Sequence, residues 1–124
     1  MTTAQLNRAN RMRVILTRDG PTCAWCRTDV SGRTAPTTDH LVPRVKGGPS
    51  WLENEIAACP RCNRLRGHTS PTDWLAECIR RGWTPDAERI ARILLSLESA
   101  ITQRGGQRRA KQYTAAQLRR LAKP

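Results

Sequence analysis

The stretch TTDHLVPRVKGG, Thr37–Gly48, contains one of the two histidines of the chain, preceded by a carboxylate and followed by a proline and paired glycines. The threonines and Leu41 favour an extended strand here, and the proline limits its continuation. A loop must follow, because two adjacent glycines seldom continue a regular element. The sequence therefore predicts that Asp39 and His40 lie near the end of a short strand, next to a turn.

Two Cys-x-x-Cys pairs flank this stretch, Cys23 with Cys26 before it and Cys59 with Cys62 after it. Each pair can place two thiolates on one side of a tight turn, and four thiolates match the tetrahedral preference of Zn²⁺. A disulfide framework fits poorly because the count of five cysteines is odd, and a redox pair would leave the other pair unexplained. We therefore predict a closed, structural zinc site, and we expect the fifth cysteine, Cys78, to pack in the core.

Local signals place further elements around this unit. An amphipathic helix is expected over residues 3–18, and a second short strand over 55–58. Pro60 suits the first turn of a helix that runs to about Arg66. Two more helices start at Ser70-Pro71 and at Thr84-Pro85, where a cap residue precedes a proline.

The tail after the last of these helices is rich in basic residues and has no acid. It has too few apolar residues to fold alone, so we interpret it as a mobile arm. The chain is accordingly divided into an N-terminal helix (1–20), a zinc-stapled core (21–68), C-terminal helices that pack on the core (69–103) and a basic flexible arm (104–124).

The chain has a formal net charge of +12 in 124 residues, with a pI of about 11.1. Such a field attracts polyanions, and nucleic acid is the commonest polyanion in the cytosol. No apolar run approaches the roughly 20 residues that a membrane span needs, and the N-terminus does not read as a secretory signal. We expect a soluble cytoplasmic protein, bacterial or made by a phage in its host, with no membrane partner.

Taken in order, these features resemble the HNH endonuclease family in its zinc-stapled form, across residues 23–66. The elements that carry the resemblance are the two cysteine pairs, Asp39-His40, Pro43, Gly47-Gly48, Asn54 and Asn63. The resemblance implies an α+β fold with a small ββα-metal core, also called the His-Me finger, in which strand, loop, strand and helix surround one catalytic ion.

The same resemblance implies a role for each matching residue. His40 would be the general base that activates water, and Asp39 beside it a metal ligand. Asn54 would brace the loop and help to orient His40. Asn63 stands where the family has its final histidine, and would be the second metal ligand. The implied catalytic ion is Mg²⁺ or Mn²⁺, with Ni²⁺ or Zn²⁺ as further options.

Residue chemistry agrees with these roles. A neutral imidazole can take a proton from water near pH 7, and a carboxylate oxygen suits Mg²⁺. A neutral amide at Asn63 is a weaker ligand than imidazole, so His68 is an alternative ligand, although a surface role is commoner for such a histidine. Four arginines are candidates for holding the phosphate: Arg44, Arg61, Arg64 and Arg66.

We therefore expect a metal-dependent endonuclease that nicks or cleaves double-stranded DNA, as a monomer or as a dimer on the DNA. Two alternatives remain: a zinc-knuckle module that binds DNA or RNA without cutting it, and a ribosome-associated zinc protein. The second has no need for Asp39, His40 and Asn63 together. Some small members of the family work beside the genome-packaging machinery of phages, which makes that machinery a further candidate partner.

Overall fold

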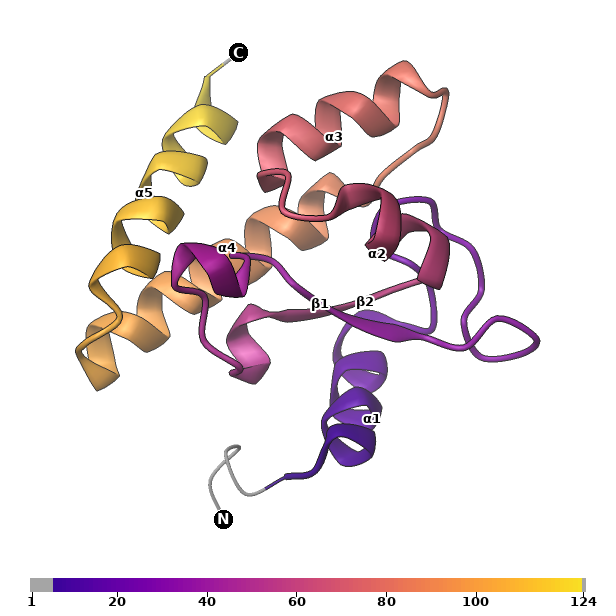
Figure 1. Ribbon diagram of the computed structural model, residues 1–124, viewed down its shortest axis with the longest axis horizontal. Helices are drawn as coiled ribbons and strands as arrows, with labels where there is room; N and C mark the ends of the chain where they lie inside the picture. Colours follow the sequence, from indigo (N-terminus) through magenta and orange to yellow (C-terminus); the bar gives the residue numbers. More distant parts are fainter. Residues whose placement is uncertain (1–5, 124) are drawn as a thin grey trace.

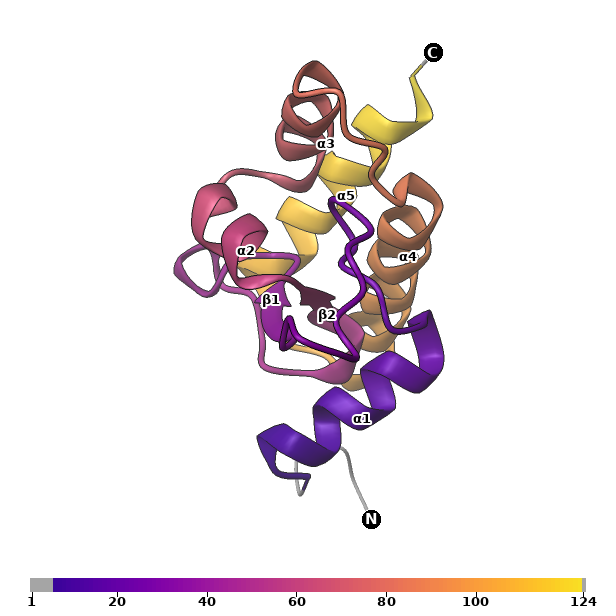
Figure 2. The ribbon, with the colours of Figure 1, turned by 90° about the vertical axis from the view of Figure 1, so that its right-hand side faces the viewer.

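A short antiparallel hairpin lies at the centre of the computed structural model, which describes residues 6–123 (Figure 1). Helices surround it, with α1 at the end of the molecule opposite α3 (Figures 1 and 2). Along the chain the elements are α1 (Arg8–Asp19), β1 (Thr37–His40), the 3-10 turns η2 (Arg44–Lys46) and η3 (Leu52–Asn54), β2 (Glu55–Ala58), α2 (Pro60–Arg66), α3 (Pro71–Arg80), α4 (Ala87–Arg104) and α5 (Arg108–Ala122).

The hairpin and α2 form the predicted ββα unit. Strands β1 and β2 pair in the register that places His40 opposite Glu55 and Thr37 opposite Ala58. The first strand is short and covers only Thr37–His40. Helix α2 begins at Pro60, as predicted, and packs on β1. The fold class is therefore α+β, as the sequence indicated.

The N-terminal helix is shorter than the sequence suggested. It begins at Arg8, because the side chain of Asn7 accepts a hydrogen bond of 2.8 Å from the amide of Asn10 and caps the first turn. The earlier part of the expected helix, residues 3–5, lies outside the residues that the structure describes. Arg18, near the other end of α1, donates to the backbone carbonyls of Leu52 and Glu55 and so ties α1 to the hairpin.

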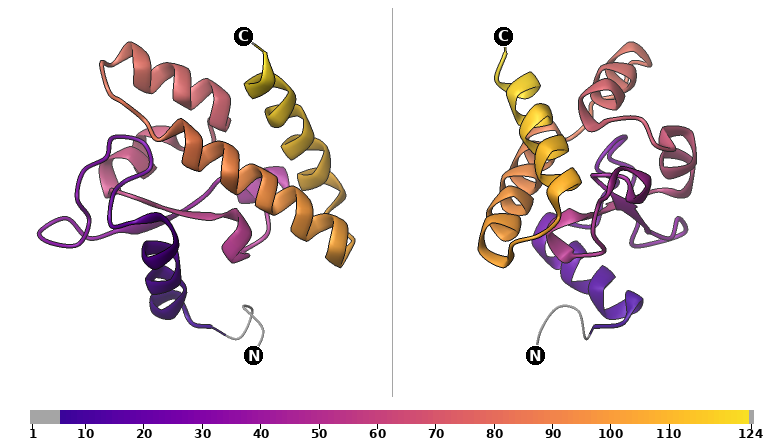
Figure 3. Two further views of the ribbon diagram at one scale, coloured as in Figure 1. Left: turned by 180° about the vertical axis from the view of Figure 1, so that it is seen from behind. Right: turned by 60° about the vertical axis from the view of Figure 1, so that its left-hand side comes forward.

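Helix α3 begins at Pro71, as expected, whereas α4 begins at Ala87, later than the predicted start at Thr84-Pro85. The side chain of Ser70 caps α3, and that of Asp86 caps α4. Helix α4 crosses the back of the hairpin, as the view from behind shows (Figure 3). Its apolar stripe is buried, and the buried members are Ile90, Ile93, Leu94, Leu97, Ala100 and Ile101.

The segment 104–124 differs from the expected flexible arm, because most of it forms α5. This helix packs along α4 and touches α3 (Figure 3). Its inner face is small and partly polar, with Ala110, Thr114 and Gln117 buried. The side-chain oxygen of Gln117 accepts from the amide of Thr72 at 3.0 Å. A face of this composition gives a weak hydrophobic signal in the sequence, and the helix is stabilised by the partners it meets in the fold.

Buried side chains form one large cluster around the two Cys-x-x-Cys turns, α3 and the first half of α4. Cys78 belongs to this cluster and is fully buried, as predicted. Trp25 and Trp74 are buried with it, and Trp83 is half-buried at its edge. Over residues 6–123, the structure contains no helix with the length and apolar character that crossing a membrane requires.

Candidate functional site

His40 ends strand β1 and borders two hollows in the protein surface. The larger hollow, about 770 Å³, lies between α1 and the hairpin, and Glu55 forms part of its wall. The smaller, about 160 Å³, is lined by Asp39 and His68 among others. The side chains shared by both hollows are Thr38, His40, Arg44 and Asn63. The structure therefore brings the predicted base together with two of the other predicted site residues.

The imidazole of His40 is mostly shielded from solvent. Its Nε2 lies 3.2 Å from the hydroxyl of Ser50 and 3.5 Å from Oε2 of Glu55. Burial, together with the positive charges of Arg44 and Arg11, lowers the pKa of His40 to about 4. The ring is consequently neutral at pH 7, which is the form that can accept a proton.

Asp39 points to the opposite side of the strand from His40, since neighbouring residues in a strand face opposite ways. Its Oδ1 accepts a hydrogen bond of 2.7 Å from Arg66 Nη1, and its Oδ2 accepts one of 2.8 Å from Trp25 Nε1. Burial raises the pKa of Asp39, and the guanidinium of Arg66 opposes this shift. The carboxylate is thus held at the inner wall of the smaller hollow.

Arg66 occupies a different environment from the one expected of a phosphate ligand. It is 1% exposed, and its guanidinium also donates to the carbonyls of His40, Leu41 and Thr69. It lies over the ring of Trp25, with 5.2 Å to the ring centroid. Because its donors are directed at these protein oxygens, Arg66 clamps the end of β1 to α2 and does not face a substrate.

Asn54 braces the loop between the strands. It is fully buried, and its Oδ1 accepts from the amide of Val42 at 2.8 Å. Its Nδ2 donates to the carbonyls of Val42, at 3.1 Å, and Pro49, at 2.9 Å. Gly48 has to be small at this point, because a Cβ there would overlap the carbonyl oxygen of Val42 and lie 2.9 Å from Asn54 Nδ2.

Asn63 lies on α2 directly after the last zinc cysteine and borders both hollows. Its Nδ2 donates to Thr37 Oγ1 at 3.0 Å and to the carbonyl of Thr38 at 3.1 Å. No donor among residues 6–123 bonds to its Oδ1. The amide is therefore fixed by its nitrogen, and its oxygen is available to a ligand.

The other predicted binding residues are spread over two regions. Arg44 is exposed and borders both hollows, and His68 is exposed and borders the smaller one. Arg61 lies beside the zinc cysteines and over the ring of Trp83, at 4.6 Å from the ring centroid. Arg64 is exposed on α2. Arg44 is therefore the exposed predicted phosphate ligand that borders the same hollows as His40.

Three residues of the larger hollow were missed by the sequence reasoning. Arg8 and Arg11 come from α1, and Glu55 begins β2. Arg11 Nε donates to Glu55 Oε1 at 3.1 Å, inside the hollow. An acid directly opposite His40 is detectable only once the register of the hairpin is known, and the register is not encoded in the spacing of the motif.

The four paired cysteines meet as predicted. Their sulfur atoms all lie within 4.8 Å of one another, and those of Cys26 and Cys59 are 3.8 Å apart. Tetrahedral Zn²⁺ with bonds of about 2.3 Å needs sulfur atoms about 3.8 Å apart, so the cluster fits this ion. The hydrogen bond between Cys62 and Cys23 lowers the pKa of Cys23 to about 4 and raises that of Cys62, as expected of closely spaced thiols that share a proton.

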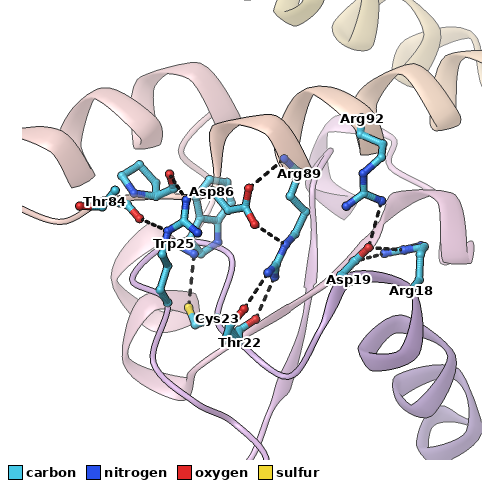
Figure 4. A network of polar contacts seen from close by, with 11 residues as sticks. Arg18, Asp19, Thr22, Cys23, Trp25, Thr84, Asp86, Arg89 and Arg92 are labelled. Atoms are coloured by element: carbon cyan, nitrogen blue, oxygen red, sulfur yellow. Dashed lines mark hydrogen bonds and ion pairs between the residues drawn. The ribbon is translucent and has the colours of Figure 1, made fainter.

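The first cysteine turn is anchored to α4 by a polar network (Figure 4). Arg89, at 3% exposure, donates to the carbonyl of Thr22 at 2.8 Å, to its hydroxyl at 2.7 Å, and to Asp86 Oδ2 at 3.1 Å. The amide of Asp86 in turn donates to the carbonyl of Ala24 at 2.9 Å. The C-terminal helices therefore hold the zinc turn in place and do not merely cover it.

Comparison with known proteins agrees with this geometry. The HNH endonuclease family model matches residues 23–69. The CRISPR-associated endonuclease Cas9 of Corynebacterium diphtheriae is 36% identical over 53 residues, which cover 42% of this chain and 5% of that protein. The protein of the same name from Actinomyces naeslundii is 33% identical over 60 residues, or 48% of this chain and 5% of the relative.

The similarity to these curated relatives is thus confined to one small part of each of them. No solved structure matches the chain. The matched segment contains both cysteine pairs, the hairpin and α2, which are the elements that build the site described above. Residues 23–69 of this chain are therefore similar to an HNH endonuclease domain, both in sequence and in the order of their elements.

Proposed function

We propose that the protein is a metal-dependent endonuclease that hydrolyses phosphodiester bonds of double-stranded DNA, with His40 as its general base. The observation that carries the proposal is the position of His40. Its neutral imidazole borders the same hollows as the amide of Asn63 and the cation of Arg44. A base, a metal ligand and a phosphate ligand around one space are the components that this reaction needs.

In the proposed reaction His40 takes a proton from the water that attacks phosphorus. A new phosphorus–oxygen bond forms, the bond to the 3′-oxygen breaks, and the leaving oxygen takes a proton from solvent. Phosphate bound by Arg44 would offset part of the positive charge that lowers the pKa of His40. Substrate binding would therefore raise this pKa towards neutrality, where a general base is most effective.

Asp39 and Asn63 would hold the catalytic ion. Asn63 offers an oxygen to which no donor among residues 6–123 is bonded, and each oxygen of Asp39 has a second lone pair beside its hydrogen bond. Held there, Mg²⁺ or Mn²⁺ would supply polarisation of the phosphate and stabilisation of charge on the leaving oxygen. Arg66 already offsets the charge of Asp39, and the amide of Asn63 is neutral. These two ligands would therefore bind a divalent ion only weakly.

Phosphate binding is assigned to cations on both sides of the larger hollow. Arg44 borders it from η2 and Arg8 from α1, and both are exposed. Exposed guanidinium groups bind phosphate oxygens in pairs and carry little sequence information. The net charge of +12 adds attraction that does not depend on sequence. The four cysteines would hold a structural Zn²⁺, since a site with four protein ligands leaves no position for substrate.

The test is nicking of supercoiled plasmid by zinc-loaded protein in Mg²⁺, Mn²⁺, Ni²⁺ or no added divalent ion. His40→Ala should lose at least about 10²-fold in rate while its Kd for the plasmid is retained. His68→Ala, which removes the other histidine, should keep its activity, because the second ligand is assigned to Asn63. Ion-dependent nicking that survives His40→Ala would refute the assignment of the base.

A second function has an observation in its favour. Both oxygens of Asp39 are bonded within the protein, which is the arrangement of a structural carboxylate. If the zinc-loaded protein binds plasmid tightly and cuts it in none of the ions, a zinc-stapled DNA- or RNA-binding module replaces the nuclease as the function.

A further inference from the structure

Glu55 is a buried carboxylate for which the proposed reaction has no use. Its side chain is completely shielded from solvent, and it begins the strand that pairs with His40. One oxygen, Oε1, accepts from Arg11 at 3.1 Å. The other, Oε2, has no hydrogen-bond partner in the part of the chain that the structure describes, and it lies 3.5 Å from His40 Nε2.

The hairpin register explains why these two side chains meet. Residues directly opposite each other in an antiparallel pair have Cβ atoms about 5 Å apart and point to the same face. His40 and Glu55 are such a pair, whereas Asp39 and Ile56 form the next pair on the other face. The geometry of the strands therefore directs the carboxylate of Glu55 to one edge of the imidazole.

Stability alone does not account for a carboxylate here. Burying a charge is unfavourable unless its oxygens are well bonded, and one oxygen of Glu55 is not. The unbonded oxygen is aimed at the single ring nitrogen that also approaches Ser50.

We propose that Glu55 is the positioning residue of His40: its Oε2 faces Nε2 at 3.5 Å, favours the ring form that carries its proton on Nε2, and so leaves the lone pair of the ring on Nδ1. An ionised carboxylate only accepts hydrogen bonds, so the pair requires the proton on Nε2. The Ser50 hydroxyl can accept from the same group. Arg11 fixes Glu55 from its far side, which keeps the ring from rotating away. This assignment rests on the proposed function for its consequence in catalysis.

Glu55→Gln tests the assignment, with Glu53→Gln as the matched control. Both variants remove one negative charge, and Glu53 lies on η3, where it pairs with Arg104 at 2.8 Å. The two should bind plasmid DNA with the same Kd. In single-turnover nicking at saturating protein, Glu55→Gln should be at least about 10²-fold slower than Glu53→Gln, because a misplaced base loses alignment with the water. The comparison is made on zinc-loaded, folded protein.

Equal nicking rates for the two variants would overturn the assignment. A deficit of Glu55→Gln that disappears at higher Mg²⁺ concentration would also overturn it, because Glu55 would then be a metal ligand. Glu55→Asp, which retains the charge but withdraws it by one methylene, should recover part of the rate.

A measurement on the wild-type protein is independent of activity. The ring nitrogens of the two histidines can be followed by ¹⁵N NMR at pH 7. His40 should carry its proton on Nε2, and a proton on Nδ1 would overturn the assignment. If the wild-type protein does not nick DNA, the proposed function fails, and this tautomer measurement still decides whether Glu55 orients His40.

Discussion

Removal of the Asn54 side chain should destabilise the protein more than any other single asparagine substitution. The side chain makes three buried hydrogen bonds, all to the backbone of the loop that follows His40. Each bond contributes about 1 kcal/mol, and Asn54→Ala also leaves the backbone groups of Val42 and Pro49 without their partner. We expect a loss of about 3 kcal/mol or more, against a total stability on the order of 5–15 kcal/mol for a small domain.

The direction of the hydrogen bonds makes the test sharper. Asn54→Asp keeps the shape and the bond from the Val42 amide, but it places an oxygen where Nδ2 faces two carbonyl oxygens at 3.1 and 2.9 Å. Repulsion there should make Asn54→Asp at least as unstable as Asn54→Ala, although it is the smaller change. Asn10→Ala, on α1, should cost about 0.5 kcal/mol or less.

Chemical unfolding of the zinc-loaded protein, followed by tryptophan fluorescence, measures these differences. The slope of the free energy of unfolding against denaturant should be the same for all variants, so that midpoints can be compared. The bracing role of Asn54 would be refuted if the free energy of unfolding of Asn54→Ala were within about 1 kcal/mol of the wild-type value. It would also be refuted if Asn54→Asp were more stable than Asn54→Ala.

Three further expectations follow from the structure. Removing zinc with a chelator should abolish the folded signal in far-UV circular dichroism, whereas Cys78→Ala, which removes a buried cysteine outside the cluster, should leave the zinc content unchanged. The folded-state pKa of His40 is about 4 against a usual 6.5, so the unfolded chain binds the proton more readily between these values. The free energy of unfolding should thus fall as the pH drops from about 6.5 to about 4, less steeply in His40→Ala; equal slopes would contradict the shifted pKa. Gly48→Ala should force Val42 and Asn54 apart and lower the unfolding midpoint, whereas Gly32→Ala, which has open space around it, should not.

Local signals in the sequence were enough to predict much of the fold. The zinc cluster follows from two turns that each bring a pair of thiolates together, and the helix starts at Pro60 and Pro71 follow from residues next to one another in the chain. The apolar stripe of α4 is long enough to be recognised by its period. These features depend on the geometry of residues close together in the chain, so the spacing of the residues in the sequence is enough to predict them.

The errors concern features that depend on how distant segments meet. In the sequence, Arg66 has the pattern of a surface cation on a short helix. In the structure it is buried, because it bonds to the carboxylate of Asp39 and to backbone carbonyls at the end of β1. The position of Glu55 opposite His40 depends on the hairpin register, and the helical structure of α5 depends on its partners in α3 and α4. The roles assigned to His40, Asp39, Asn54 and Asn63 in the reaction remain predictions, and the nicking experiment tests them.

The hydrogen bond from Trp25 to Asp39 has a consequence for how such a domain is inherited. Trp25 lies between Cys23 and Cys26, so the contacts that connect the cysteine cluster to the carboxylate lie within residues 23–69. A segment that carries its own scaffold can be transplanted between unrelated chains, and the similar stretch occupies only 5% of each of two larger relatives. In this chain, α1 lies outside that segment, and its residues Arg11 and Arg18 donate hydrogen bonds to Glu55 of β2. We therefore expect proteins that share this segment to differ mainly in the helices that flank it, and less in the segment itself.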